Sequence, residues 1–348
     1  MMNVLIIQQK MIGDVLISSL LCENIKKWNP SSKIDFIANT HTVPILQNNP
    51  NIDKIIIFED SFKTNKISLL KFLINQKKKK YDILIDAYGK TESILISLLT
   101  PAKIKIGFKK WYSKWVYSQS INREKYRLDG DLQLTIKNRI KLLIPIIGNE
   151  FDYLTSPKIY INKYEKNKAK LKLKNIKSPI IMISLLGSSN IKTYPLKKMN
   201  RLLNFLVDKY DVKLILNYMN SQESQAIQLI NSLGNKTLES ILLDQKPPNS
   251  LRDYISLVSM CDAVIGNEGG GINIAKSLNL PSFSIFAPQI NPSGWINSSP
   301  SEVGVHIMDY DQNFQKFRLN DNEIIEFYNS FEFELFRGKL SIFMDRLS

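Results

Sequence analysis

The 348-residue sequence contains little cysteine and little histidine, and both scarcities narrow the possible functions. Its two cysteines, Cys22 and Cys261, lie in apolar patterns. This favours buried thiols in a reducing compartment over a disulfide framework. The two histidines, His41 and His306, are far apart in the sequence, which argues against most histidine-built metal sites. We therefore do not expect a metal site built from histidines.

Long apolar runs and secretion signals are also missing. The longest runs, such as residues 179–186, are too short to span a bilayer, and the chain opens directly into an apolar strand pattern at residues 4–7. The loop after that strand lacks the G-x-G-x-x-G spacing of a dinucleotide site. We therefore expect a cytoplasmic protein without a dinucleotide cofactor.

Positive charge is in excess, with 47 lysines and arginines against 32 acidic residues and a net charge of +15. Such an excess favours anionic partners, namely nucleic acids, phosphorylated sugars or an anionic membrane face. The lysines are scattered, and runs such as residues 77–80 also fit an ordinary solvated face. Because no helix-turn-helix, zinc or RNP-like pattern is present, a nucleic-acid partner is not expected.

Apolar periodicity predicts an α/β fold in two halves. Strand patterns alternate with helical ones, which is typical of a parallel sheet covered on both faces. The predicted strands are residues 4–7, 33–38, 54–58, 81–87 and 103–108, and then 180–185, 213–216, 263–265 and 282–286. We predict two Rossmann-like domains, residues 1–165 and 175–321, facing each other across a cleft. The amphipathic segment 322–348 is predicted to be helical.

The segment from Asp262 to Leu278 is the most informative stretch of the chain. It consists of a short apolar strand, three consecutive glycines (Gly269, Gly270 and Gly271) and an amphipathic helix. Glycines allow a ligand to approach the backbone, and a helix start offers N–H groups to phosphate. A tight turn without a ligand has the same pattern. Glu268 beside the glycines could bind ribose hydroxyls or only stabilise the loop.

Two further loops follow predicted strands. Gly13 and Asp14 lie after the first strand, where Asp14 is either an N-cap or a carboxylate that can take a proton from a substrate hydroxyl. The second loop contains Ser188, Ser189 and Lys192, which could bind a diphosphate or simply face water.

These motifs, in this order, resemble glycosyltransferase family 9, the ADP-heptose:lipopolysaccharide heptosyltransferases. The resemblance rests on Gly13-Asp14, on the Gly-Ser…Lys-x-Tyr-Pro loop at residues 187–195, and on the acidic, glycine-rich turn near residue 270. It includes the segments at residues 81–86 and 105–108, which are similar to the family's "yDlviD" and "riGf" strands.

The resemblance implies a GT-B fold, in which the first domain binds the acceptor, the second binds a nucleotide sugar, and the last helix packs back on the first domain. It also implies inverting transfer without a metal or other cofactor, with ADP-heptose as the co-substrate and Asp14 as the catalytic base. The donor-binding residues that it implies are Ser188, Ser189, Lys192, Asn220, Glu268, Gly269, Gly270, Gly271 and Asn273.

Three residues depart from the family pattern and leave alternatives open. Asn273 stands where the family usually has histidine, Glu268 where it has aspartate, and Asn220 where a carboxylate near the ribose is expected. The alternatives are a same-fold glycosyltransferase with another nucleotide sugar and a non-catalytic family member.

The implied acceptor is a lipid-linked oligosaccharide at the inner face of the cytoplasmic membrane, with the protein a peripheral monomer. Aromatic rings suit sugar faces and cations suit phosphates, so the stretch around Trp111 and Trp115 is a candidate contact. A partly buried helix with solvated lysines would have the same composition. The candidate acceptor-binding residues are Gly13, Lys109, Lys110, Lys114, Arg123 and Arg127.

Overall fold

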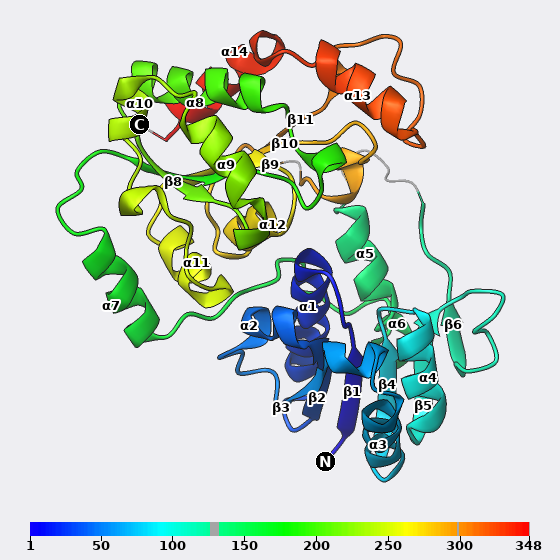
Figure 1. Cartoon of the computed structure of the whole chain (residues 1–348). Helices are drawn as coiled ribbons and strands as arrows, with labels where there is room; N and C mark the ends of the chain where they lie inside the picture. Colours follow the sequence, from blue (N-terminus) through cyan, green and yellow to red (C-terminus); the bar gives the residue numbers. More distant parts are fainter. Residues whose placement is uncertain (126–131, 298, 348) are drawn as a thin grey trace. The chain divides into compact units, whose positions relative to one another are not determined.

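Two fully parallel β-sheets, each flanked by helices, form the protein (Figure 1). The computed structural model describes residues 1–125, 132–297 and 299–347. The chain divides into two units, Met1–Tyr160 and Ile161–Ser348. The predicted α/β class is confirmed, while the cleft between the domains stays a prediction.

The first sheet has the order β3-β2-β1-β4-β5-β6. Its strands are β1 (Asn3–Ile7), β2 (Lys33–Asn39), β3 (Lys54–Phe58), β4 (Tyr81–Asp86), β5 (Ala102–Phe108) and β6 (Gln119–Ile121). The apolar run of β1 is fully buried because helices cover both faces of the sheet. The strand order reverses between β1 and β4, and open α/β sheets bind their ligands at the carboxyl edge beside such a reversal.

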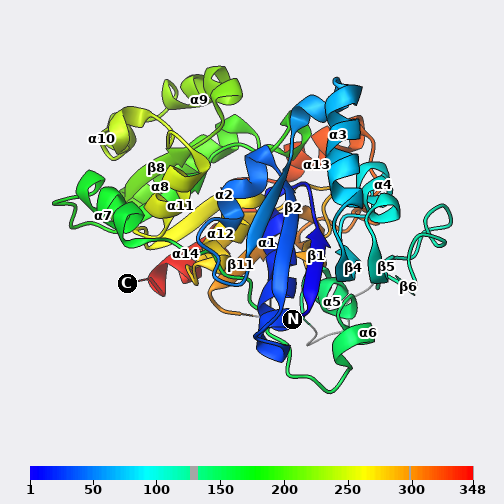
Figure 2. The same cartoon turned by 90° about the horizontal axis from the view of Figure 1, so that it is seen from below.

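Helices cover opposite faces of this sheet because the chain winds outward from β1 in both directions (Figure 2). On one face, α1 (Ile12–Trp28) packs against α5 (Leu134–Lys141). On the other face, α3 (Lys66–Lys77) packs beside α4 (Thr91–Leu99), over a cluster that includes Phe58, Phe62 and Phe72. Two short helices, α2 (Val43–Leu46) and α6 (Ile144–Ile147), complete the described α-helices of the unit.

The second sheet has the order β11-β10-β9-β7-β8. Its strands are β7 (Ile180–Ser184), β8 (Lys213–Asn217), β9 (Ala263–Asn267), β10 (Ser282–Ile285) and β11 (Glu302–Val305). Its reversal point lies between β7 and β9, whose carboxyl ends are adjacent in register. The helices that precede the carboxy-terminal pair are α7 (Lys163–Lys172), α8 (Leu196–Tyr210), α9 (Glu223–Ile230), α10 (Asn235–Glu239), α11 (Leu251–Val258) and α12 (Gly270–Ser277).

The carboxy-terminal segment forms two helices, α13 (Asp321–Ser330) and α14 (Phe333–Asp345), where we expected one. The break falls at Phe331, which is buried and takes a non-helical ψ of 72°. Phe336 and Phe343 of α14 lie 6.1 and 5.6 Å from the ring of Phe283 on β10, so α14 belongs to the core of the second unit. The packing of the last helix on the first domain stays a prediction.

Other differences from the predicted elements occur at sheet edges and at a proline. The edge strands β6 and β11 are short and incompletely buried, so their sequences carry no strong apolar pattern. The sequence pattern predicts one helix over residues 131–147, of which residue 131 lies outside the described residues. The structure has two helices there, α5 and α6, and Pro145 lies in the first turn of α6. Within the described ranges, no helix is both long and apolar enough to cross a bilayer.

Candidate functional site

Asp14 lies at the carboxyl edge of the first sheet, in the first turn of α1. The N-cap of that helix is Met11, so the interpretation of Asp14 as the capping residue is wrong. A carboxylate in the first turn is still favoured by the helix dipole. The Asp14 side chain is 34% exposed, which leaves it accessible to a substrate.

A buried guanidinium holds this carboxylate. Arg139 of α5 is only 6% exposed in its side chain, and its Nη2 lies 3.0 Å from Oδ1 of Asp14. Its Nε donates to Oγ of Ser18 at 2.8 Å, and Nη2 also donates to Oε1 of Gln8 at 3.2 Å. Burial lowers the pKa of Arg139 to about 10, and the nearby Asp14 charge opposes this shift. Arg139 therefore keeps its charge at neutral pH and fixes one side of the Asp14 carboxylate.

Asp86, at the end of β4, is a second carboxylate, and its charge also interacts with Arg139. It is fully buried and accepts hydrogen bonds from the hydroxyl of Tyr117 at 2.7 Å and from the backbone N–H of Gly89 at 2.7 Å. Burial raises the pKa of Asp86, and the Tyr117 hydrogen bond is the largest opposing effect. Because Asp86 has no exposed surface, its role is to shape the loop after β4, and Asp14 is the carboxylate open to solvent.

The structure separates the predicted acceptor residues into a pair near Asp14, namely Gly13 and Arg123, and a group of lysines after β5. Gly13 is buried beside Asp14, and the Arg123 guanidinium stacks 3.9 Å from the ring centre of Phe108, where its charge interacts with Asp14. Burial lowers the pKa of Arg123, and the nearby charges of Asp14 and Asp86 oppose this shift. Lys109 and Lys114 are exposed in the turns after β5, and Lys110 donates to the carbonyl of Gly89. Arg127 lies outside the described residues.

In the second unit, the loop after β7 is held in a tight conformation. A Cβ added to Gly187 would lie 2.2 Å from the carbonyl oxygen of Lys192, so only glycine fits there. The Gly187 N–H donates to the Thr193 hydroxyl at 3.0 Å, which in turn donates to the carbonyl of Ser189. The loop therefore presents Ser188 and Ser189 to solvent, as a site for phosphate oxygens requires.

Asn267, at the end of β9, joins this loop to the glycine-rich turn. Its Oδ1 accepts the backbone N–H of Tyr194 at 2.6 Å, and its Nδ2 donates to the carbonyl of Leu185 at 2.8 Å. The side chain is completely buried. The sequence-based prediction did not include Asn267, although a polar residue that ends a buried strand is a signal for such a role.

The glycine-rich turn forms the amino terminus of α12, as the sequence predicted. Gly269 is the N-cap, with φ at +147°, a conformation that side-chain-bearing residues rarely adopt. Gly270 and Gly271 open the helix, so their N–H groups have no carbonyl partner within it. Asn273 donates through Nδ2 to the carbonyl of Gly269 at 3.1 Å, which leaves one amide hydrogen for a ligand.

Lys192 and Glu268 lie close enough for their charges to interact. Burial raises the pKa of Glu268, and the Lys192 charge opposes this rise. Asn220 is exposed in the turn after β8, and the next residue but one, Gln222, donates to the carbonyl of Gly187 at 2.7 Å. Most of the predicted donor residues thus lie in connected loops at the carboxyl edge of one sheet, and Gln222 is a support that the sequence prediction missed.

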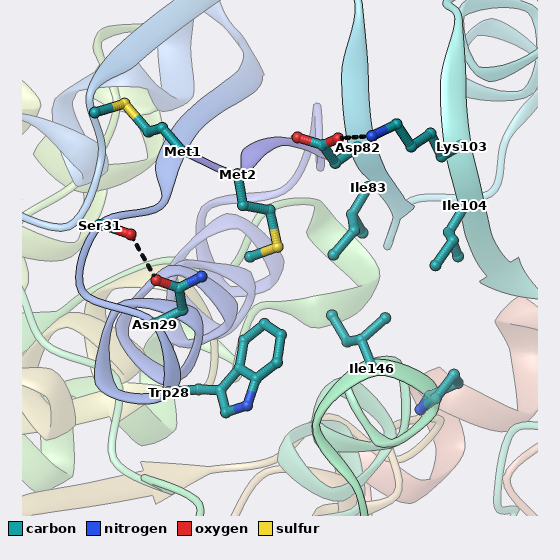
Figure 3. Close-up of a pocket in the computed structure, with 11 residues that line it drawn as sticks. Met1, Met2, Trp28, Asn29, Ser31, Asp82, Ile83, Lys103, Ile104 and Ile146 are labelled. Carbon is teal, nitrogen blue, oxygen red and sulfur yellow. Dashed lines mark hydrogen bonds and ion pairs between the residues drawn. The ribbon is translucent and has the colours of Figure 1, made fainter.

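An open pocket in the first unit lies at the opposite edge of its sheet (Figure 3). It is lined by residues near the amino ends of β4 and β5, including the ion pair of Asp82 with Lys103 at 2.7 Å. Open α/β sheets place their sites at the carboxyl edge, so we assign no function to this pocket. Among the residues that the structure describes, no group of three or more His, Cys, Asp or Glu side chains could hold a metal.

Two doubly wound units, with an accessible carboxylate at the carboxyl edge of one sheet and a glycine-rich turn at that of the other, match the GT-B fold. A model of glycosyltransferase family 9 (heptosyltransferase) matches residues 70–317. The chain belongs to this family and is a glycosyltransferase, which confirms the resemblance found in the sequence.

A relative is similar to this chain in sequence, and two solved structures are similar to it in fold. The chain is 25% identical to lipopolysaccharide heptosyltransferase 1 of Campylobacter coli over 305 residues, which are 82% of this chain and 84% of the relative. It resembles a glycosyl transferase of family 9 from Veillonella parvula, with a TM-score of 0.73, 14% identity and coverage of 94% and 96%. It also resembles E. coli heptosyltransferase WaaC with ADP-2-deoxy-2-fluoro heptose, with a TM-score of 0.68, 16% identity and coverage of 94% and 99%.

Proposed function

We propose that the protein transfers heptose from ADP-heptose to a lipopolysaccharide core acceptor, with inversion at the anomeric carbon and without a metal. The observation that carries this proposal is the accessible carboxylate of Asp14, held by the buried Arg139 at the carboxyl edge of the first sheet. The relative solved with ADP-2-deoxy-2-fluoro heptose and the curated lipopolysaccharide heptosyltransferase support the choice of donor and acceptor.

In the proposed reaction, Asp14 acts as the general base. Its free oxygen accepts the proton of an acceptor hydroxyl while that oxygen attacks the anomeric carbon of the donor. The bond from the anomeric carbon to the diphosphate breaks on the opposite side, and ADP leaves with the bonding electrons. Arg139 prevents the carboxylate from turning away from the attacking hydroxyl.

The leaving diphosphate develops negative charge that the second unit is equipped to stabilise. Lys192 supplies a positive charge, Ser188 and Ser189 supply hydroxyls, and Gly270 and Gly271 supply N–H groups at the start of α12. Groups fixed in advance, as the Asn267 hydrogen bonds fix these loops, need little reorganisation during the reaction.

Replacing Lys192 with alanine is expected to weaken ADP binding by about 10- to 100-fold, because a charge-assisted hydrogen bond contributes roughly 1.5–3 kcal/mol. Isothermal titration calorimetry with ADP measures the change. Lys197→Ala removes an exposed lysine of the neighbouring helix α8 and serves as the control. An unchanged affinity in the Lys192 variant would reject its role at the diphosphate.

A thermal-shift comparison of ADP, UDP and GDP tests the identity of the donor, since a ligand that binds only the folded state raises the melting temperature. We expect ADP to give the largest shift and ADP-heptose to transfer its sugar to a heptose-free lipopolysaccharide core. A larger shift with UDP or GDP would indicate a different nucleotide sugar. Binding without transfer or donor hydrolysis would indicate a non-catalytic family member, the alternative that Asn273 raises.

We propose that the acceptor is lipid-linked and that the protein works as a peripheral monomer at the inner face of the cytoplasmic membrane. Arg123, near Asp14, is the best placed of the predicted acceptor residues to contact an acceptor phosphate. The exposed Trp111 offers a ring for a sugar face, with Lys109 and Lys114 beside it.

A further inference from the structure

Helix α3 has an apolar stripe on its outer surface. Ile67, Leu70 and Ile74 are 69%, 57% and 45% exposed. Their spacing of three and four residues places them on one side of the helix. The opposite side carries Phe72 and Leu73, which are buried in the core of the first unit. The helix is thus apolar on two sides, although packing in this fold uses only one.

The neighbouring helix extends this surface. Leu95 and Leu98 of α4 are 37% and 42% exposed, while Ile96 on the opposite side is buried in the same core. Helices α3 and α4 pack beside each other on one face of the first sheet (Figure 2). The five exposed aliphatic residues form what we call the α3–α4 face. Exposed apolar side chains that gather on neighbouring helices are a signal of an interaction site.

Exposed lysines lie along α3 and directly after its carboxyl end. The exposed lysines of this stretch are Lys66, Lys71, Lys77, Lys78 and Lys80. The sequence has no acidic residue between Asp60 and Asp82, and Glu92 of α4 is half-buried. Lys79 is different, because it pairs with Asp35 at 3.5 Å. The apolar stripe is thus bordered by cations that no acidic side chain of the same helix neutralises.

We propose that the α3–α4 face binds the surface of an anionic lipid bilayer. Aliphatic side chains of an amphipathic helix insert at the boundary between headgroups and acyl chains, and flanking lysines contact the anionic headgroups. A second copy of the chain would bring two rows of lysines together, which repel. Nucleic acid would satisfy the lysines but not Ile67, Leu70 and Ile74. The proposal rests on the proposed function only for its biological setting, because lipid binding requires neither donor nor acceptor.

Sedimentation with vesicles tests this surface directly. The full-length protein should sediment with vesicles that contain 30% phosphatidylglycerol in phosphatidylcholine, and much less with phosphatidylcholine alone. The combined variant Ile67→Ser, Leu70→Ser, Ile74→Ser should bind at least about 10-fold more weakly. The matched control changes Ile227, Ile325 and Ile342 of the second unit to serine; these residues are 46%, 53% and 56% exposed. A loss of binding in the α3 variant, with control binding equal to that of the wild type, supports the proposal. Equal losses in both variants, or wild-type binding in the α3 variant, overturn it.

The lysines are tested separately. The variant Lys66→Gln, Lys71→Gln, Lys77→Gln, Lys78→Gln should lose its preference for the anionic vesicles. Its control, Lys163→Gln, Lys166→Gln, Lys170→Gln, Lys174→Gln, makes the same change of net charge at exposed lysines of the second unit. Equal losses in both would mean that only net charge attracts the protein, which contradicts a specific face.

Two further measurements separate this inference from its rivals. Analytical ultracentrifugation without lipid should give the same sedimentation for the wild type and the serine variant, whereas dissociation of an oligomer in the variant would assign the face to a second copy. Transfer to a water-soluble, delipidated acceptor should be unchanged in the serine variant. If neither protein transfers heptose but the wild type binds vesicles, the proposed function fails and the lipid surface stands.

Discussion

Exchange of Asp14 for asparagine is expected to lower the turnover number for heptose transfer by about 100- to 10,000-fold, the range that general bases contribute. Asparagine has nearly the shape of aspartate, and its amide oxygen can still accept the hydrogen bond from Arg139. The amide cannot take a proton from the acceptor hydroxyl, so attack on the anomeric carbon loses its base. The loss should therefore appear in the turnover number and not in the binding of the donor.

Three measurements separate the loss of a base from other defects. ADP affinity by calorimetry should be nearly unchanged, because the proposed diphosphate site is in the second unit. The melting temperature reports whether the neutral side chain disturbs the buried Arg139. Asp152→Asn is the matched control, since it neutralises an exposed aspartate that pairs with Lys27. If Asp14→Asn keeps most of its turnover, another group is the base.

Much of the fold could be predicted from local sequence pattern. The buried strands β1 and β7 are short, uninterrupted apolar runs, and turns and polar loops separate them from the helical patterns. The glycine-rich turn could be predicted because the three consecutive residues Gly269, Gly270 and Gly271 permit backbone conformations that other residues rarely adopt. Such a run between a strand and a helix is typical of a tight turn. By contrast, the edge strands β6 and β11 depend on neighbours supplied by the sheet, and their own sequences barely indicate them.

The supports of the candidate site were harder to predict, because they join residues that are distant in sequence. Arg139 meets Asp14 across 125 residues, and Asn267 meets Tyr194 across 73. In the sequence, Arg139 is one of many cations in a helical pattern, and nothing distinguishes it from Lys137 or Lys141. Only the folded chain shows that Arg139 is buried while those lysines pair with Glu124 nearer the surface.

The outer side of α3 illustrates the opposite difficulty. Its apolar residues spread over more than half of the helix circumference, so the sequence does not indicate which part of that surface is buried. The structure buries only one side, and the exposed remainder then needs an explanation. A sequence pattern can thus indicate an apolar helix without indicating which of its faces the fold leaves uncovered.

Replacement of Arg139 by methionine is the second change for which we expect a large effect. Methionine fills a similar volume but cannot donate to Asp14, Ser18 or Gln8. Without the guanidinium, the Asp14 carboxylate can adopt orientations that face away from the acceptor, and a misplacement of about 1 Å can reduce a rate by roughly 100-fold. We expect a fall of that order in the turnover number, with an unchanged affinity for ADP. Arg139 is a positioning residue in this account, because it acts through Asp14.

The loss of stability must be separated from the loss of positioning. Oε1 of Gln8 and Oγ of Ser18 lose a partner in the buried interior, which should lower the free energy of unfolding by roughly 1–3 kcal/mol. Arg252→Met provides the comparison, since Arg252 of the second unit is 13% exposed and its Nε donates to Oε1 of Glu165 at 2.7 Å. Both variants should melt earlier, while only Arg139→Met should lose turnover per folded molecule.

The conservative variant Arg139→Lys distinguishes charge from geometry. A lysine ammonium can reach Asp14, but it lacks the planar set of donors that lets Arg139 bind Asp14, Gln8 and Ser18 together. If orientation of the carboxylate matters, turnover in the lysine variant should lie between that of the wild type and that of Arg139→Met. Equal turnover in the two variants would assign the effect to the guanidinium's hydrogen bonds, and wild-type turnover in Arg139→Met would show that Asp14 needs no partner.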